Sequence, residues 1–191
     1  MELILASQSP RRRELLGLLQ IPFTVRIADI DETMDPALEP AQAVAQVSRR
    51  KALAVPRSGE DVVIAADTIV VCQGRILGKP ATAAQAEEML RLLSGREHQV
   101  MTGLCVLRAD REIVTTEVTT VHFRPVADWE IARYVASGEP MDKAGAYGIQ
   151  GGASLFCSGI TGDYYNVVGL PVCKLWEVLG QIAPEWMGGS L

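Results

Sequence analysis

Three consecutive arginines follow a short serine-containing segment near the start of the chain. Residues 7–13 read Ser-Gln-Ser-Pro-Arg-Arg-Arg, and Ser9 followed by Pro10 predicts the beginning of a helix with Ser9 as its N-cap. The helix dipole disfavours cations in a first turn by roughly 0.3–1 kcal/mol each. Arginines are useful there if the turn, with the hydroxyls of Ser7 and Ser9, holds a polyanion such as a triphosphate. The alternative is an exposed helix whose arginines are solvated or pair with its own acidic residues.

A single carboxylate interrupts a stretch that is otherwise apolar. Asp67 lies between residues 62–66 and 69–71, which are valine, isoleucine and alanine. Because an unpaired buried charge is very costly, Asp67 must have a partner. A metal ion or an attacking water would be a productive one, since an acid held by a rigid strand is well placed to act as a base. The alternatives are a bend that turns Asp67 to solvent and a bond to a neighbouring backbone group.

Acidic residues gather in a loop between residues 28 and 41. The loop contains Asp29, Asp31, Glu32 and Asp35, and carboxylate oxygens are the ligands that hard cations such as magnesium prefer. Glu32 is therefore a candidate metal ligand. The alternative is a solvated acidic loop, which is the commoner case.

Three lysines and one glycine-rich loop complete the set of candidates. Lys51, Lys79 and Lys143 lie at expected element boundaries, where an ammonium could reach phosphate oxygens. Residues 142–151 combine small residues, which permit close approach of a backbone, with the Gln150 amide, which could pair with the edge of a base. The alternatives are ordinary surface lysines and an ordinary mobile loop, although irregular loops of about ten residues are often functional.

Alternating strands and helices must position these residues. We expect strands at 3–6, 62–72, 75–77, 99–107 and 112–123, with two short ones around 155 and over 164–168. We expect helices from Pro10, over 41–55, over 83–93 with Thr82 as N-cap, from an Asp128 N-cap to Gly138, and from Pro171 to about 182. This order predicts an α/β protein whose residues 1–191 form a single domain.

The composition limits the classes of function. The chain of 191 residues is 48% hydrophobic, and its net charge of -5 argues against a surface for stable nucleic-acid or anionic-membrane binding. We see no signal peptide and no stretch of membrane-spanning length. The four cysteines form no CxxC pair and cannot assemble a zinc signature with the two histidines. We therefore expect a cytoplasmic protein that binds neither nucleic acid nor membrane.

Several segments in order resemble the Maf family, also called septum formation inhibitor or Maf-like nucleotide pyrophosphatases. The segments read LASQSPRRRELL, AADTIVV, LGKP, LLSGREHQVMTG, DKAGAYGIQGGASLF and GDYYNVVGLPV, and the resemblance extends from Leu5 to about Leu179. The resemblance implies an α/β fold similar to that of inosine triphosphate pyrophosphatases. Such a fold has an elongated mixed sheet flanked by helices and two lobes that share the sheet around a central cleft. It also implies a homodimer.

The resemblance assigns roles to individual positions. Asp67 corresponds to the family's proton acceptor. The positions that line the nucleotide and metal site are Ser7, Arg12, Glu32, Lys51, Lys79, Lys143 and Gln150. The positions that distinguish the branch acting on dTTP and UTP are Arg11, Thr68 and Gln150.

The implied activity is hydrolysis of dTTP and UTP to the monophosphate and pyrophosphate. The implied cofactor is a divalent cation, Mg²⁺ or Mn²⁺, held by Asp67 and Glu32. The sequence does not rank dTTP, UTP and modified pyrimidine triphosphates. The alternative is a non-hydrolytic, nucleotide-binding regulator of cell division, which the septum-inhibitor name leaves open.

Overall fold

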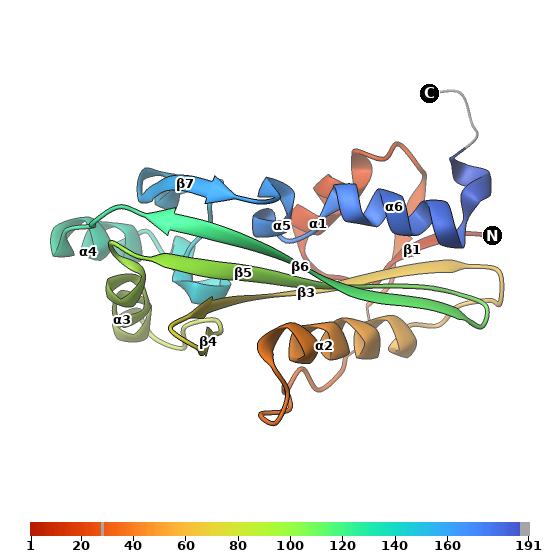
Figure 1. Cartoon of the computed structure of the whole chain (residues 1–191), viewed down its shortest axis with the longest axis horizontal. Coiled ribbons are helices and arrows are strands. Elements are labelled where there is room, and N and C mark those ends of the chain that lie inside the picture. The colour runs from red at the N-terminus through yellow and green to blue at the C-terminus, as the bar shows by residue number, and fades with distance from the viewer. Residues whose placement is uncertain (28, 188–191) are drawn as a thin grey trace. The chain divides into compact units, whose positions relative to one another are not determined.

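Strands and helices alternate along the chain (Figure 1). The computed structural model describes residues 1–27 and 29–187. The strands are β1 (Leu3–Leu5), β2 (Phe23–Val25), β3 (Val62–Cys72), β4 (Arg75–Leu77), β5 (Glu97–Arg108), β6 (Arg111–Phe123) and β7 (Cys157–Thr161). The helices are α1 (Pro10–Gly17), α2 (Pro40–Ala54), α3 (Ala83–Leu93), α4 (Asp128–Ala136), α5 (Tyr164–Val168) and α6 (Val172–Ile182). Across these two described ranges, no helix is long and apolar enough to cross a membrane.

The strands form one mixed sheet, which confirms the predicted α/β class. Their order is β2-β1-β3-β5-β6-β7, and β4 pairs with β3. β1 is parallel to both of its neighbours, with Leu5 opposite Val25 of β2 and Ile64 of β3. β4 is antiparallel to β3, and β7 is antiparallel to β6. Strand and helix alternation therefore gives a parallel edge, whereas the β3–β4 hairpin and the pairing of β6 with the distant β7 are antiparallel.

The chain forms two compact units. Unit 1 comprises Met1–Asp67, Thr102–Glu117 and Gly169–Leu191, and unit 2 comprises Thr68–Met101 and Val118–Val168. Three of the four boundaries fall within β3, β5 and β6, so each of these strands contributes residues to both units, and the fourth follows α5.

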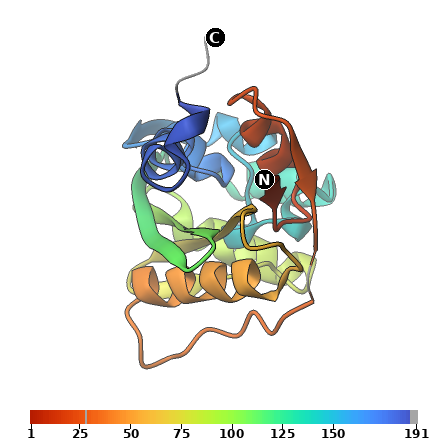
Figure 2. The same ribbon diagram turned by 90° about the vertical axis from the view of Figure 1, so that its right-hand side faces the viewer.

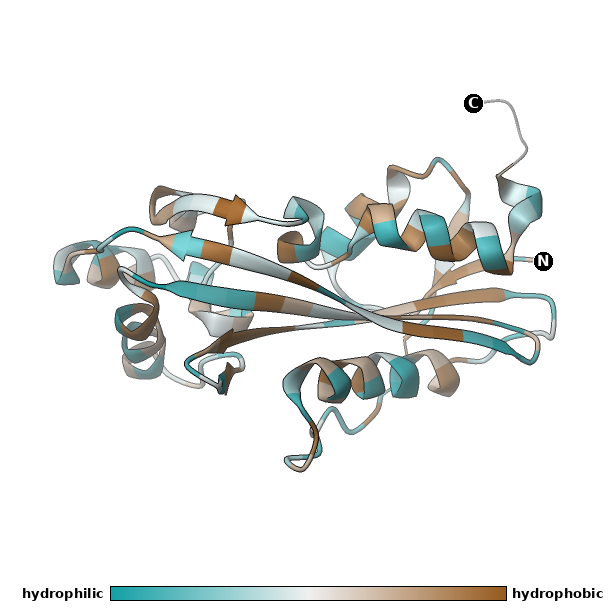
Figure 3. Cartoon of the chain, in the orientation of Figure 1, coloured by the Kyte–Doolittle hydropathy of each residue, from teal (hydrophilic) through white to brown (hydrophobic). Residues whose placement is uncertain are grey.

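In unit 1 the sheet is covered on both faces. Figures 1 and 2 show α2 along one face, with α1 and α6 along the other. Ile4 of β1 and Val63 of β3 belong to a buried cluster that includes Ala52 of α2. Leu5, which points to the opposite face of β1, is also fully buried. Cover on both faces explains why β1 and the first part of β3 are apolar runs, and Figure 3 shows the hydrophobic colour along the part of β3 in unit 1.

In unit 2 the predicted helix over 83–93 is confirmed as α3. Its N-cap is Thr82, whose Oγ1 accepts from the backbone N–H of Gln85 at 3.2 Å. The apolar side of α3 buries Leu90 and Leu93 and contacts α4. An aromatic cluster of edge-to-face rings fills the interior, with His98 packed on Phe123 at a centroid distance of 4.9 Å.

Two predictions of secondary structure after residue 150 are wrong. Residues 164–168 form the helix α5 rather than a strand, and Leu155 ends a 3-10 turn that precedes β7. The helical turn is favoured because Oδ1 of Asp163 accepts from the backbone N–H of Tyr165 at 2.7 Å. The fully buried Asn166 side chain also donates to the carbonyl of Val100 at 3.1 Å. These side-chain bonds override the strand propensity of the tyrosines and valines.

The predicted N-cap of α4 is also wrong by one residue. Asp128 is the first helical residue, and Ala127 occupies the cap position. The backbone N–H of Ala127 donates to Oε2 of Glu130 at 2.9 Å, so the acidic residue at the third helical position does the capping.

Candidate functional site

Arg12 lies in the first turn of α1, and three hydrogen bonds within unit 1 hold it in place. Its backbone N–H donates to Oγ of Ser9 at 3.4 Å, which confirms Ser9 as the N-cap. Its side-chain Nε donates to the carbonyl of Gly169 at 2.7 Å, and its NH1 donates to Oγ of Ser7 at 3.4 Å. Ser7 and Arg12 are thus in direct contact. The predicted row of three arginines separates here, because Arg11 and Arg12 are half-buried whereas Arg13 is exposed.

Opposite charges meet around the Arg12 guanidinium. Burial lowers the pKa of Arg12 below its ordinary value of 12.5, and Asp67 opposes that shift. Arg11 lowers the pKa further, while Glu32 raises it. Unit 1 therefore gathers predicted phosphate-binding cations and predicted metal-binding carboxylates in one neighbourhood.

Lys51 joins the two predicted metal ligands. Its ammonium donates to Oδ1 of Asp67 at 2.6 Å and lies 2.9 Å from Oε1 of Glu32. Lys51 lies in the last turn of α2, and Asp67 lies on β3. The side chains of Lys51 and Asp67 are each only 14% exposed. The expectation that Asp67 must have a partner is therefore confirmed, and the partner here is an ammonium.

Arg50 holds the loop that carries Glu32. Its NH1 donates to the carbonyl of Asp31 at 2.8 Å, and its NH2 donates to the carbonyl of Thr33 at 2.6 Å. These two carbonyls flank Glu32. Asp31 and Asp35 each accept from a backbone N–H two residues further along, at 2.8 and 2.9 Å, so both carboxylates stabilise local turns. Of the predicted acidic cluster, Glu32 is the member that faces Lys51.

The pair of carboxylates fits a divalent cation in number and chemistry. Oxygens of Glu32 and Asp67 already converge on one cationic group, the Lys51 ammonium. Within residues 1–27 and 29–187, no group of three or more His, Cys, Asp or Glu side chains is placed to hold a metal ion. Mg²⁺ commonly takes one or two carboxylates and completes its shell with water and substrate phosphates. Two protein carboxylates are therefore a sufficient donor set for that cation.

In unit 2 the segments that carry Lys79 and Lys143 lie against each other. The backbone N–H of Gly145 donates to the carbonyl of Gly78 at 3.0 Å. Lys79 is exposed, whereas the Lys143 ammonium donates to the carbonyl of Glu139 and to Oδ1 of Asp142, both at 2.7 Å.

The predicted specificity residues differ in exposure. Gln150 is exposed within a turn in which the N–H of Gly151 donates to the carbonyl of Gly148 at 3.1 Å. Thr68 is half-buried on β3 and is the first residue of unit 2.

Sequence reasoning missed several residues that hold these groups. No sequence pattern points to Gly169, because a backbone carbonyl carries no sequence signal for a contact 157 positions away. Arg50 stood in a basic run with no feature to separate it from its neighbours. Tyr134 and Glu139, which bond to the loop around Gln150, lie outside the glycine-rich segment itself.

The chain belongs to the family of Maf-like proteins, whose match covers residues 2–182. A dTTP/UTP pyrophosphatase of Symbiobacterium thermophilum is 51% identical over 191 residues, which cover 99% of this chain and 98% of the relative. A dTTP/UTP pyrophosphatase of Moorella thermoacetica is 52% identical over 181 residues, covering 93% of each chain. Among solved structures, a Ham1 protein from Coxiella burnetii is 15% identical with a TM-score of 0.49, over 95% of this chain and 99% of that chain. The family resemblance of the sequence motifs is therefore confirmed.

Proposed function

We propose that this chain is a nucleoside triphosphate pyrophosphatase that hydrolyses dTTP and UTP to the monophosphate and pyrophosphate. Relatives about half identical over at least 93% of the chain carry the name dTTP/UTP pyrophosphatase. The structural observation that carries the proposal is the Lys51 ammonium between Asp67 and Glu32, in the neighbourhood of Arg12. A carboxylate surrounded by cations supports the proposal, because cleavage of a phosphoanhydride needs a base beside groups that stabilise negative charge.

In this proposal Asp67 is the general base. Lys51 fixes Oδ1 of its carboxylate, and β3 fixes its backbone. Asp67 accepts a proton from the water whose oxygen forms a bond to the α-phosphorus. The bond between the α-phosphorus and the bridging oxygen then breaks, and pyrophosphate leaves with that oxygen. Arg12 and Lys51 stabilise the charge that develops on the leaving group.

We also propose that Glu32 and Asp67 hold a divalent cation, Mg²⁺ or Mn²⁺. When bound, the cation would neutralise phosphate charge and lower the pKa of a coordinated water. With its three N–H donors, the Lys51 ammonium would keep its bond to Asp67, and the donor that faces Glu32 in this structure could turn to phosphate oxygens. Lys79 and Lys143 are further candidates for phosphate contacts, since a lysine binds phosphate as a flexible point charge.

The remaining parts of the proposal concern selectivity and assembly. We assign recognition of the pyrimidine to Gln150, with Arg11 and Thr68 as further specificity residues. The amide of Gln150 can both donate and accept at a base edge. We also propose a cytoplasmic homodimer, as the family resemblance implies.

The direct test incubates purified protein with dTTP or UTP and Mg²⁺ and measures pyrophosphate and monophosphate. We expect equal amounts of the two products. Nucleotide binding without turnover would instead favour the non-hydrolytic regulator, and orthophosphate release would mean that a different bond is cleaved.

Asp67→Asn tests the assignment of the base. We expect this variant to fold, to bind nucleotide and to lose at least about 100-fold in turnover, since general-base catalysis typically contributes 10²–10⁴-fold. Near-normal pyrophosphate release by the folded variant would remove Asp67 from this role.

A further inference from the structure

Tyr134 and Glu139 enclose the base of the turn that carries Gln150. The hydroxyl of Tyr134 donates to Oε1 of Glu139 at 3.0 Å and accepts from the backbone N–H of Gly148 at 3.1 Å. Oε2 of Glu139 accepts from the backbone N–H of Gly152 at 3.0 Å. The two side chains therefore bind backbone amides on both sides of Gln150. We call Tyr134 and Glu139, with these three bonds, the tyrosine–glutamate clamp.

Glycines make the clamp sterically feasible. A Cβ at Gly151 would overlap Oε1 of Glu139, and a Cβ at Gly152 would lie 3.1 Å from Cδ2 of Tyr134. The carboxylate and the ring thus occupy the space that side chains at these positions would need. The glycines in this part of the loop are explained by the close approach of the clamp to the backbone.

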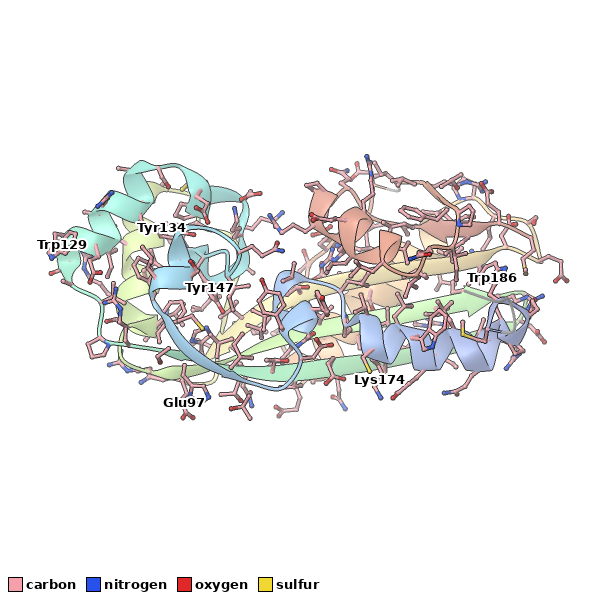
Figure 4. All side chains as sticks on the ribbon, turned by 90° about the horizontal axis from the view of Figure 1, so that it is seen from above. Glu97, Trp129, Tyr134, Tyr147, Lys174 and Trp186 are labelled. Carbon is pink, nitrogen blue, oxygen red and sulfur yellow. The ribbon has the colours of Figure 1, made fainter. Side chains whose placement is uncertain are left out.

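The clamp is built on rigid surroundings. Tyr134 is 6% exposed, and its ring packs edge-to-face on Phe156 at a centroid distance of 5.4 Å. Burial raises the pKa of Tyr134 above its ordinary value, so its hydroxyl keeps the proton that it donates to Glu139. Figure 4 labels Tyr134 on α4 and Tyr147 in the loop that follows. Tyr147 is itself held by His98, whose Nε2 lies 2.8 Å from its hydroxyl.

The turn between the clamped amides exposes the Gln150 amide. The N–H of Gly151 donates to the carbonyl of Gly148, which closes a turn with Ile149 and Gln150 at its corner. Ile149 is 9% exposed and anchors the inner side of this turn, whereas Gln150 is exposed. A side chain that reads a base must be held in one orientation by its supporting shell.

We propose that Tyr134 and Glu139 are positioning residues for substrate selection, because their clamp fixes the backbone that aims the Gln150 amide at the pyrimidine. This inference rests on the proposed function. Neither residue is assigned a contact with the substrate, and both act through the turn.

The principal test is Tyr134→Phe, which removes the hydroxyl while keeping the ring on Phe156. Glu139→Gln is the second variant, because an amide offers one acceptor oxygen where the clamp uses two. We expect kcat/KM for dTTP and UTP to fall about 10-fold, within the 10–100-fold range typical of supporting residues. Most of the loss should appear in KM, and discrimination against purine triphosphates should narrow.

A matched control separates positioning from a loss of stability. Glu130→Gln, also in unit 2, removes a carboxylate that accepts from Arg124 and from the N–H of Ala127. It should reduce stability without changing KM or discrimination. Tyr164→Phe removes a hydroxyl from an exposed tyrosine and should leave KM and the discrimination against purine triphosphates unchanged.

Backbone hydrogen exchange gives a readout that does not depend on turnover. In the nucleotide-free protein, Tyr134→Phe should accelerate exchange at the amide of Gly148 by at least about 10-fold, since it removes the hydroxyl that accepts from this amide. The amides of α3 should not change. If the wild type binds dTTP without hydrolysing it, the proposed function fails, and dTTP affinity of the variants then replaces KM in judging the clamp.

Two results would overturn the inference. One is unchanged exchange and unchanged KM in a folded Tyr134→Phe protein. The other is faster exchange with unchanged KM and discrimination, which would make the clamp a purely structural feature. If Tyr134→Phe does not fold, Gly151→Ala serves instead, because its methyl group displaces the Glu139 carboxylate and leaves Tyr134 in place. It is expected to raise KM in the same way, and an unchanged KM would again contradict the proposal.

Discussion

The Lys51 ammonium donates to Oδ1 of Asp67 at 2.6 Å, and both side chains are only 14% exposed. Glu32 approaches the same ammonium from a loop and is 59% exposed. One cation thus neutralises two carboxylates, one of them largely shielded from water. Removing the ammonium would leave those two negative charges close together in unit 1.

Lys51→Met should therefore impair both activity and stability. We expect turnover of dTTP to fall at least about 100-fold, since preorganised charges of this kind contribute 10²–10³-fold. The free energy of unfolding should fall by about 1–3 kcal/mol, less than for a fully buried pair because Glu32 is exposed. Steady-state kinetics and urea unfolding measure the two effects.

Added Mg²⁺ should stabilise Lys51→Met more than it stabilises the wild type, because the metal then replaces the missing ammonium between Glu32 and Asp67. Lys174→Met is the control. Lys174 pairs with Glu177 at 2.6 Å on the surface of α6, and its loss should change stability by less than about 1 kcal/mol. Equal stabilisation of all three proteins by Mg²⁺ would argue against a metal site at Glu32 and Asp67.

Arg50→Gln should lower the apparent affinity of the protein for Mg²⁺. Arg50 holds the carbonyls of Asp31 and Thr33, and Glu32 lies between them. Loss of these bonds frees the loop, so we expect the Mg²⁺ concentration for half-maximal activity to rise about 10-fold, as for other residues that orient a ligand. Thermal unfolding with increasing Mg²⁺ should show the same shift.

The adjacent arginine provides the control for this variant. Arg49 pairs with Glu112 at 2.7 Å, and its side chain is 48% exposed. Arg49→Gln removes the same charge from the same helix without touching the Glu32 loop. A metal dependence that changes equally in both variants would show that charge alone, and not the position of Glu32, is responsible.

Much of the fold could be predicted from local patterns. The strands over 62–72 and 75–77, the Ser9 and Thr82 caps and the helix over 83–93 agree with the sequence prediction, because turn chemistry and hydrophobic period determine them within a few residues. The helix over 164–168 could not be predicted in this way. Its stability depends on Asn166, whose bonds to Val100 and Thr119 exist only after distant strands have assembled.

In the candidate site, too, local sequence predicts some features, whereas others depend on contacts between distant segments. The apolar neighbours of Asp67 indicated that its carboxylate needs a partner, but they could not say which one. That Lys51 is the partner follows from the packing of α2 on the sheet, which no local pattern specifies. The contact between Arg12 and the carbonyl of Gly169 likewise spans 157 positions in the sequence.

Gly103→Ala should destabilise the packing of α2 on β5. A Cβ at Gly103 would lie 2.5 Å from the carbonyl oxygen of Val44, and backbone atoms cannot rotate away as a side chain could. We expect a loss of about 1–3 kcal/mol in the free energy of unfolding, as is typical of overpacking. Urea denaturation measures the change.

Gly17→Ala is the matched substitution. Gly17 is the last residue of α1, and a methyl group added there would meet no atom of another described element within 4 Å. Alanine at this site should be neutral or stabilise by up to about 1 kcal/mol, since it reduces the entropy of the unfolded chain. Equal stability of the two variants would contradict the direct contact of α2 with the β5 backbone.

His98 should make the protein less stable in mild acid. The ring is 3% exposed, its Nε2 lies 2.8 Å from the Tyr147 hydroxyl, and its Nδ1 has no hydrogen-bond partner among the described residues. Burial, followed by the charge of His122, lowers the pKa of His98 from 6.5 to about 4. Between these two pH values the unfolded chain binds a proton that the native protein does not bind. Stability must therefore fall as the pH decreases from 6.5 to 4.

A pKa shift of this size lowers the free energy of unfolding by about 3 kcal/mol at pH 4 relative to neutral pH. Above pH 6.5 this destabilisation is absent. Urea midpoints measured from pH 7.5 down to pH 4 should therefore decline in the wild type. His98→Gln keeps a polar group near Tyr147 but cannot titrate, so its decline should be smaller by about that amount. His122→Gln removes the half-buried histidine and should retain most of the wild-type slope. Parallel curves for the wild type and His98→Gln would mean that other groups cause the acid sensitivity.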